Sequence, residues 1–152
     1  MKQHAPAHET ADRLRRECLA LRVRLINRVL SVLYDEALRP FGLRISQLNV
    51  LAAVACLGKA RPTDLCRILR IEKSTLSRDV ELMKQNGWLD SEPPVGGRNQ
   101  TIRLTPRGKK LLAKVEPSWE KAQTEARALI GDDGETAVRQ MAARLSLNQP
   151  PS

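Results

Sequence analysis

The sequence has few of the residues that enzymes and metal proteins commonly use for chemistry. Its two histidines, His4 and His8, lie near the N-terminus on either side of Pro6, so they are not expected to form a helical pair of metal ligands. It contains neither a glycine-rich phosphate loop nor a nucleophile elbow. No motif selects a lysine or carboxylate site either. We therefore expect no enzymatic activity, no bound metal and no cofactor.

Cysteines, aromatic residues and long apolar runs are also scarce. The three cysteines, Cys18, Cys56 and Cys66, are widely spaced and include no Cys-x-x-Cys, which indicates a reducing compartment. The apolar run from Val50 to Leu57 is far shorter than the roughly 20 residues of a membrane span, and the N-terminus has no apolar core of a secretion signal. We expect a soluble, cytoplasmic protein with no membrane partner. With aromatic residues at 3%, the sequence itself gives little sign of a pocket for an aromatic ligand.

The charge is unevenly distributed along the 152 residues. The net charge is +9, and residues 59–110 hold 12 basic and 6 acidic side chains, so two thirds of the excess lies in one third of the chain. A clustered positive field favours a polyanionic partner, most often nucleic acid. The alternative is a solubility bias spread over solvated faces.

The first part of the chain is predicted to be one long helix. Residues 1–9 are polar and are expected to be a flexible tail. From Thr10 to Arg39 there is no Gly or Pro, and two stripes of apolar residues recur at spacings of three and four. So wide an apolar face exceeds what one small core needs, which predicts burial against a second subunit. Ser46 is the expected N-cap of the next helix, which Gly58 ends.

A helix-turn-helix and a hairpin are predicted next. A short helix begins at Pro62, a turn follows at Arg70-Ile71, and a second helix runs from Lys73 to Asn86 before Gly87. Two strand-like runs, 88–91 and 101–104, flank a segment rich in Pro and Gly, which indicates a β-hairpin. Helical patterns return over 106–129 and 136–147, separated by Gly131 and Gly134, and 148–152 is an expected tail.

These elements predict a mainly α fold with a small β-hairpin wing. The expected organisation is a winged helix-turn-helix DNA-binding region over 46–110, preceded by an N-terminal dimerisation helix over 10–45 and followed by helices over 111–147.

The helix from Lys73 has two distinct faces. On a helical wheel Leu76, Val80 and Met83 fall on one side, and small polar or basic residues fall on the other. Such a face at the N-terminal end of a helix suits entry into the major groove, where the first turn contacts base edges. The alternatives are a solvated helix face and a protein-binding adaptor with the same fold. The predicted DNA contacts of the helix and the hairpin are Lys73, Ser74, Thr75, Ser77, Arg78, Arg98 and Asn99.

Within this set we predict different roles. Arg78 has the geometry for a bidentate contact to guanine, and the serines and threonine can donate to phosphates or bases. Arg98, beside two glycines at the hairpin tip, is placed to reach a narrow minor groove. The basic residues that follow are predicted to be phosphate neighbours or part of a solvated helix start rather than base readers: Arg103, Arg107, Lys109 and Lys110.

Several short motifs, in order, resemble the MarR family of bacterial transcriptional regulators. They are Gln-Leu-Asn-Val-Leu from Gln47, Asp-Leu-Cys from Asp64, Lys-Ser-Thr-Leu-Ser-Arg from Lys73, Asn-Gly-Trp-Leu from Asn86 and Arg-Leu-Thr-Pro-Arg-Gly from Arg103. The resemblance covers roughly residues 14–147. It implies a homodimer with interlocked terminal helices, which makes 111–147 the C-terminal dimerisation helices. It further implies binding to double-stranded DNA at a pseudo-palindromic operator. It also implies a repressor that is released by a small aromatic or phenolic effector or by thiol oxidation.

The resemblance assigns the recognition-helix positions to Lys73–Arg78 and the wing arginine to Arg98. The chain departs from the family at Arg70, which replaces a common Gly in the turn, and at Gly96, where the wing usually has an Asp. Cys18 lies near the reactive cysteine of peroxide-sensing members, with Arg15 and Arg22 on neighbouring turns. The alternative prediction is therefore a thiol-based redox-sensing repressor; otherwise Cys18 is a buried residue of the apolar stripe.

Overall fold

The computed structural model describes residues 6–93 and 100–147. The described chain is mainly helical with one two-stranded antiparallel sheet, which confirms the predicted fold class. The elements follow one another as α1 (Ala7–Glu17), α2 (Leu19–Leu38), the 3-10 turn η1 (Arg39–Phe41), α3 (Ile45–Leu57), α4 (Pro62–Leu69), α5 (Lys73–Gln85), β1 (Leu89–Glu92), β2 (Thr101–Leu104) and α6 (Pro106–Leu147).

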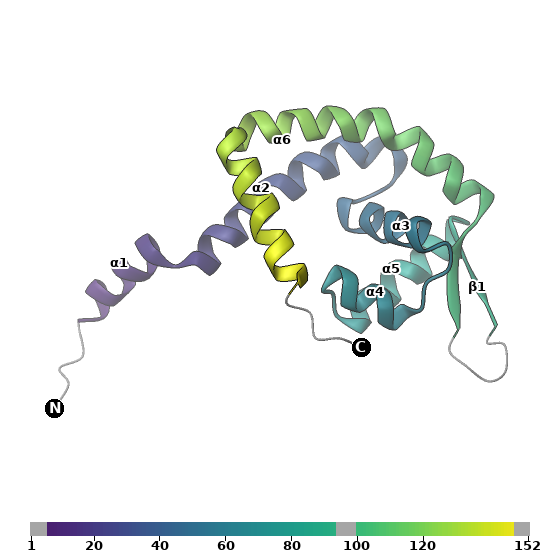
Figure 1. Ribbon diagram of the computed structural model, residues 1–152, viewed down its shortest axis with the longest axis horizontal. Helices are drawn as coiled ribbons and strands as arrows, with labels where there is room; N and C mark the ends of the chain where they lie inside the picture. Colours follow the sequence, from purple (N-terminus) through teal and green to yellow (C-terminus); the bar gives the residue numbers. More distant parts are fainter. Residues whose placement is uncertain (1–5, 94–99, 148–152) are drawn as a thin grey trace.

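Two long helices cover a smaller helical unit that ends in the hairpin. The first part of α6 lies along α2, and α3, α4 and α5 lie beneath them, with the hairpin at one end (Figure 1). Helix α1 projects away from the rest of the molecule and buries none of its side chains. The core gathers apolar side chains from α2 to α6, and its most completely buried members are Leu38, Val50, Leu51, Val54, Leu65, Leu76, Met83 and Val115.

The expected first helix is interrupted and begins earlier than predicted. The helix starts at Ala7, inside the stretch expected to be a tail, because Pro6 takes an extended conformation that suits a position just before a helix. At Cys18 the backbone is extended (ψ 111°), which separates α1 from α2. The prediction of one continuous helix from Thr10 was therefore wrong. Apolar periodicity continues across the break, so it gave no sign of it.

Helix α3 begins at Ile45, with Arg44 rather than Ser46 as its N-cap. The buried Gln47 side chain reaches back, and its Oε1 accepts a hydrogen bond of 3.1 Å from the Arg44 backbone N–H. The Ile45 N–H donates to Asp35 Oδ1 on α2 at 2.7 Å. Two side-chain acceptors thus satisfy the first amides of α3, and one of them joins this helix to the end of α2.

The turn between α4 and α5 uses an unusual residue. Arg70 has φ 54° and ψ 42°, in the left-handed region that favours Gly, and Arg70 is the only described non-Gly residue with a positive φ. Its guanidinium donates to the Leu145 carbonyl near the end of α6 at 3.4 Å. The cation therefore lies where the carbonyl end of that helix carries partial negative charge.

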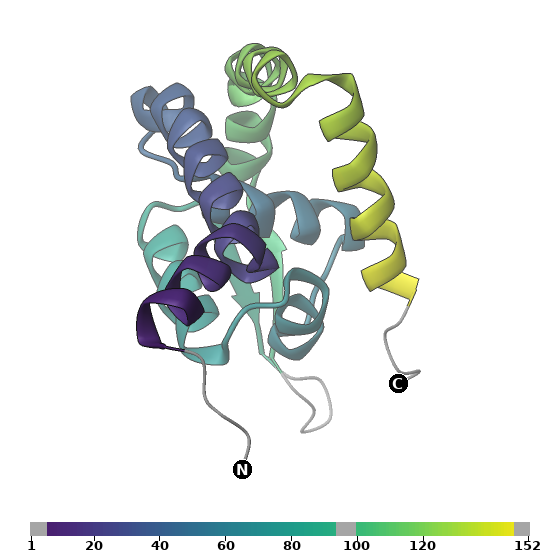
Figure 2. The same ribbon diagram turned by 90° about the vertical axis from the view of Figure 1, so that its left-hand side faces the viewer.

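Helix α6 is broken at Gly131, whose φ of 71° and ψ of 168° lie outside the helical region. The part after the bend turns back and descends towards α4 (Figure 2). Glu135 spans the bend, because its carboxylate accepts from both Arg127 and Arg139, and these bonds hold the pKa of Glu135 below its usual value. Gly134, the second expected break, is helical.

Within the described residues, no single helix combines the length and apolarity of a membrane span. Leu19–Phe41 and Ile45–Leu57 reach that composition only as a pair, and they are bent relative to each other by 75°.

We predict that Arg70→Gly is more stable than Arg70→Ala by about 1 kcal/mol, because both remove the bond to Leu145 but only Gly relieves the strain of a positive φ. Thermal unfolding of the two variants should differ by about 2–4 °C. Equal or reversed melting temperatures would contradict the conformation assigned to the turn.

Candidate nucleic-acid interface

Helix α5 is anchored through one face. Leu76, Val80 and Met83 are buried, as the helical wheel predicted, and Leu65 of α4 and Leu51 of α3 belong to the same core. Fully burying such side chains contributes about 1.5–3 kcal/mol each. The opposite face of α5 is thereby held outward.

The predicted recognition residues lie together on that outward face. Lys73, Ser74, Thr75, Ser77 and Arg78 are all exposed, in the first two turns of α5. Arg78 Nε donates to the Ser74 carbonyl one turn earlier at 3.3 Å, and the cation forms no ion pair within the described part of the chain. The guanidinium therefore retains N–H donors for a ligand.

The base of the hairpin is held by charge. Leu89 pairs with Leu104 and Asp90 with Arg103 in the antiparallel register, and Ala60 forms a further bridge with Ile102. Arg103 contacts Asp90 at 3.1 Å and Glu92 at 2.9 Å. Lys59 contacts Glu92 at 2.6 Å.

These contacts lower the pKa of both carboxyl groups. The hydrogen bond from Arg103 is the main cause at Asp90, and the bond from Lys59 is the main cause at Glu92. Arg103 thus pairs with two carboxylates, and its predicted place beside a DNA phosphate stays a prediction. The pairing within this network depends on strand register, which the sequence alone does not determine.

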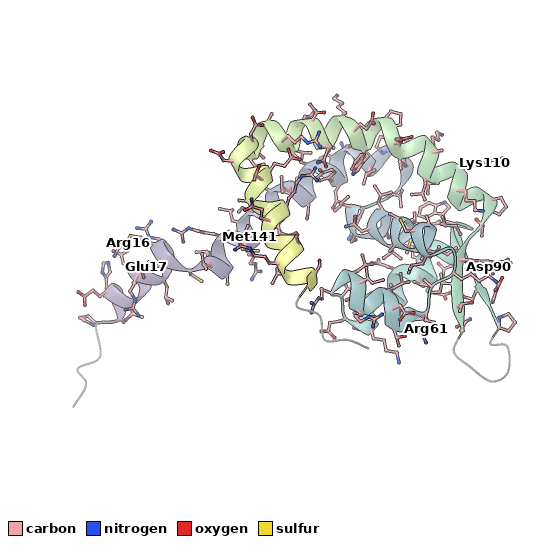
Figure 3. The ribbon with its side chains drawn as sticks, in the orientation of Figure 1. Arg16, Glu17, Arg61, Asp90, Lys110 and Met141 are labelled. Atoms are coloured by element: carbon pink, nitrogen blue, oxygen red, sulfur yellow. The ribbon has the colours of Figure 1, made fainter. Side chains whose placement is uncertain are left out.

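A similar arrangement occurs at the start of α4. Asp64 accepts hydrogen bonds from Arg61 at 2.8 and 3.2 Å and lies 3.5 Å from Arg67, and the Arg61 bond holds the pKa of Asp64 below its usual value. Arg61 and Asp90 lie on the side of the molecule that carries the hairpin, whereas Arg16 and Glu17 lie on the projecting α1 (Figure 3).

The remaining candidates are placed as follows. Arg98 and Asn99 lie outside the described residues. Cys18 lies at the break between α1 and α2 and is partly buried, and its carbonyl accepts from Arg22 at 3.4 Å. Tyr34, which burial gives a raised pKa, donates its hydroxyl to Gln123 on α6. Among the described side chains, no cluster of three or more His, Cys, Asp or Glu residues is arranged to hold a metal ion.

Comparisons with known proteins agree on one family. A model described as "MarR family" matches residues 41–98. The transcriptional regulator MosR of Mycobacterium tuberculosis, solved in complex with DNA, is 32% identical, with 85% of this chain and 93% of that chain covered and a TM-score of 0.74.

Two further relatives are more distant in sequence. A mutant of Escherichia coli MarR complexed with operator DNA is 18% identical, covers 88% of this chain and 96% of its own, and has a TM-score of 0.77. The uncharacterized HTH-type regulator YwoH of Bacillus subtilis is 26% identical over 68% of this chain and 75% of its own length. The exposed polar face of α5, the adjoining hairpin and the similarity to MosR lead to one conclusion: the chain belongs to the MarR family of DNA-binding transcriptional regulators.

Proposed function

We propose that this protein is a sequence-specific repressor that binds a pseudo-palindromic operator as a homodimer and is released by a small aromatic or phenolic effector. The observation that carries the proposal is the exposed face of α5 from Lys73 to Arg78, held outward by Leu76 and Met83. Each dimer would present two such helices to half-sites about one helical turn, or roughly 10 bp, apart. Arg98 and Asn99 complete the proposed contacts.

The solved relatives support DNA as the ligand. MosR is described in complex with DNA, and E. coli MarR in complex with operator DNA. In this chain the face offers one guanidinium, one ammonium and three hydroxyl groups without bulky apolar side chains. Guanidinium groups read guanine edges, and hydroxyl groups donate to phosphates or bases.

Arg78→Ala is expected to weaken operator binding by about 1–3 kcal/mol and to relax the base preference at one position in each half-site, as loss of a bidentate base contact does. Fluorescence anisotropy with the operator and single-base variants measures both effects. Arg28→Ala, an exposed arginine on α2, is the control. An equal loss on every duplex would overturn the role of Arg78 as a base reader.

The homodimer is supported by apolar side chains that one chain leaves in solvent. Leu19 is 76% exposed and Leu25 is 64% exposed, although both lie on a helix with regular apolar periodicity. Contiguous apolar surface of this extent marks an interaction site. We assign dimerisation to segments 10–45 and 111–147, whose exposed large apolar residues are Leu14, Leu19, Leu21, Val23, Leu25, Ile26, Val29, Val32, Trp119, Leu129, Val138, Met141 and Leu145.

Light scattering should give a mass of about twice 17.0 kDa for the native chain. Leu25→Glu places a charge in the proposed apolar interface and should yield a monomer or an unfolded chain. Leu57→Glu changes an apolar side chain of similar exposure outside these segments and should leave the dimer intact. A native chain with the mass of one copy at micromolar concentration would refute the homodimer.

A groove between α3 and α6 supports the proposal that a small molecule binds as an effector. It has a volume of about 480 Å³, within the usual range for small-molecule sites. Leu48, Leu112 and Val115 give it apolar walls, and Trp119 supplies an aromatic face. The groove lies between α6, which belongs to the proposed dimerisation segment, and α3, which precedes the helix-turn-helix.

The alternative, redox release through Cys18, makes the opposite prediction for two variants. If a phenolic effector acts in the groove, Trp119→Ala should abolish DNA release by phenolic compounds and Cys18→Ser should leave it unchanged. If peroxide acts through Cys18, Cys18→Ser alone should abolish release by peroxide. Gel-shift titrations with each agent separate the two mechanisms, and peroxide release that survives in Cys18→Ser excludes the thiol sensor.

A further inference from the structure

The groove between α3 and α6 carries a negative charge in its wall and no positive one. Among the described residues that line it, Glu116 of α6 is the only ionisable one, and the nearby Lys114 and Lys121 are not part of the lining. Glu116 is exposed and forms no ion pair within the described part of the chain. In a protein with a net charge of +9, this groove is therefore a local site of negative charge.

A proline adds a second acceptor beside this carboxylate. Pro117 lies inside α6 and has no backbone N–H to donate. A helical carbonyl normally accepts from the N–H four residues later, so the Ala113 carbonyl lacks its usual partner. Ala113 lines the same groove as Glu116. A carbonyl in this position needs an N–H or O–H donor from elsewhere, and a ligand in the groove can supply one.

The remaining walls suit an aromatic cation. Asn49 of α3 brings a side-chain amide whose oxygen is a further acceptor. Trp119 is 38% exposed and lines the groove with its indole ring, the face of which attracts cations. Leu48 and Val115 supply apolar surface, and the volume of about 480 Å³ has room for an aromatic ring.

We propose that the groove selects its ligand by charge and takes small aromatic amines in preference to aromatic acids. The protonated amine donates to the Glu116 carboxylate and the Ala113 carbonyl, and the ring lies against Trp119. An ammonium group has three donors and no acceptor, so it complements a wall of acceptors. A carboxylate has only acceptors and meets Glu116 with a like charge. The inference rests on the proposed effector site and adds the chemical class of the effector.

The first test compares three probes that share a phenyl ring and differ in charge: 2-phenylethylamine, 2-phenylethanol and phenylacetate. NMR titrations that follow the indole N–H of Trp119 report binding in this groove. The amine should bind about two- to fivefold more tightly than the alcohol, as expected for one exposed ion pair, and the acid should bind most weakly. High salt should reduce the advantage of the amine. Equal affinities, or tightest binding of the acid, would contradict the proposal.

Two variants of one residue identify the carboxylate. Glu116→Gln keeps the shape of the side chain and removes its charge, so the amine should lose its advantage over the alcohol. Glu116→Lys should reverse the native order and make phenylacetate the tightest ligand. Glu120→Gln changes an exposed glutamate of α6 outside the lining and should keep the native order. If Glu116→Gln also keeps that order, the carboxylate does not select the ligand.

Pro117→Ala tests the free carbonyl. Alanine supplies the N–H that proline lacks, so the helical bond to Ala113 forms and this acceptor is no longer open to a ligand. The variant should melt at a higher temperature than the native protein and yet bind 2-phenylethylamine severalfold more weakly. Unchanged affinity for the amine in a stabilised variant would contradict the contact with Ala113.

DNA-binding measurements separate this inference from the proposed function. If no probe shifts the Trp119 signal, the groove is not an effector site and both proposals fail. If the alcohol and the acid bind as tightly as the amine and release DNA, only the charge preference fails. If the amine binds with the expected preference but leaves the DNA complex intact in anisotropy measurements, the charge preference stands and the effector role fails.

Discussion

The arrangement of the molecule depends on the burial of one face of α5. Leu76 and Met83 are almost completely removed from solvent, in the same core as Leu51 and Leu65. A helix with one apolar stripe has one stable rotation on such a core, because any other rotation exposes the stripe and buries polar groups. The direction of Ser74, Ser77 and Arg78 is therefore set by residues that never meet the ligand.

Electrostatics then divides the basic residues into two groups. Arg61, Arg103 and Lys59 lie within 3.1 Å of carboxylates, and these bonds lower the pKa values of Asp64, Asp90 and Glu92. These cations therefore form ion pairs that stabilise the start of α4 and the base of the hairpin. Lys73, Arg78 and Lys84 form no ion pair within the residues that the structure describes, so their charge is available to a polyanion. The distribution of partners, rather than the net charge, marks the surface where DNA would bind.

Sequence patterns predicted the elements well where the apolar periodicity agrees with the Gly and Pro residues that bound a helix. Lys73 to Asn86 formed the expected helix to within one residue, and Gly87 ended it with a positive φ. Sequence patterns failed where tertiary contacts decide where a helix begins or breaks. The break at Cys18 interrupts an unbroken apolar stripe, and α3 begins at Ile45 because Asp35 and Gln47 satisfy its first amides. Of two glycines that both suggested a break in α6, only Gly131 has a non-helical backbone.

The candidate site, like the fold, could be predicted from the sequence only in part. The outward face of α5 was predictable, because a single helix carries all of it and its spacing determines which residues point outward. The pocket between α5 and the hairpin was not predictable, since Ser77 of α5 and Ser91 of β1 line one space only through the packing of the hairpin on α5. Strand register also decided that Arg103 would pair with Asp90 and Glu92 rather than remain free.

The C-terminal part of α6 contacts the turn before α5, and this contact bears on how the proposed regulation would reach α5. Glu135 holds the bend of α6 through Arg127 and Arg139, and the end of that helix meets Arg70 in the turn before α5. Arg70 itself has a positive φ, which costs a non-Gly residue about 1–2 kcal/mol, so the contacts around the turn must hold it in that conformation. A change in how the terminal helices pair would thus act on the turn directly, and the turn controls the angle between α4 and α5. In the proposed dimer the distance between the two α5 helices depends on such angles, so small shifts at the bend would misplace both helices relative to half-sites of fixed spacing.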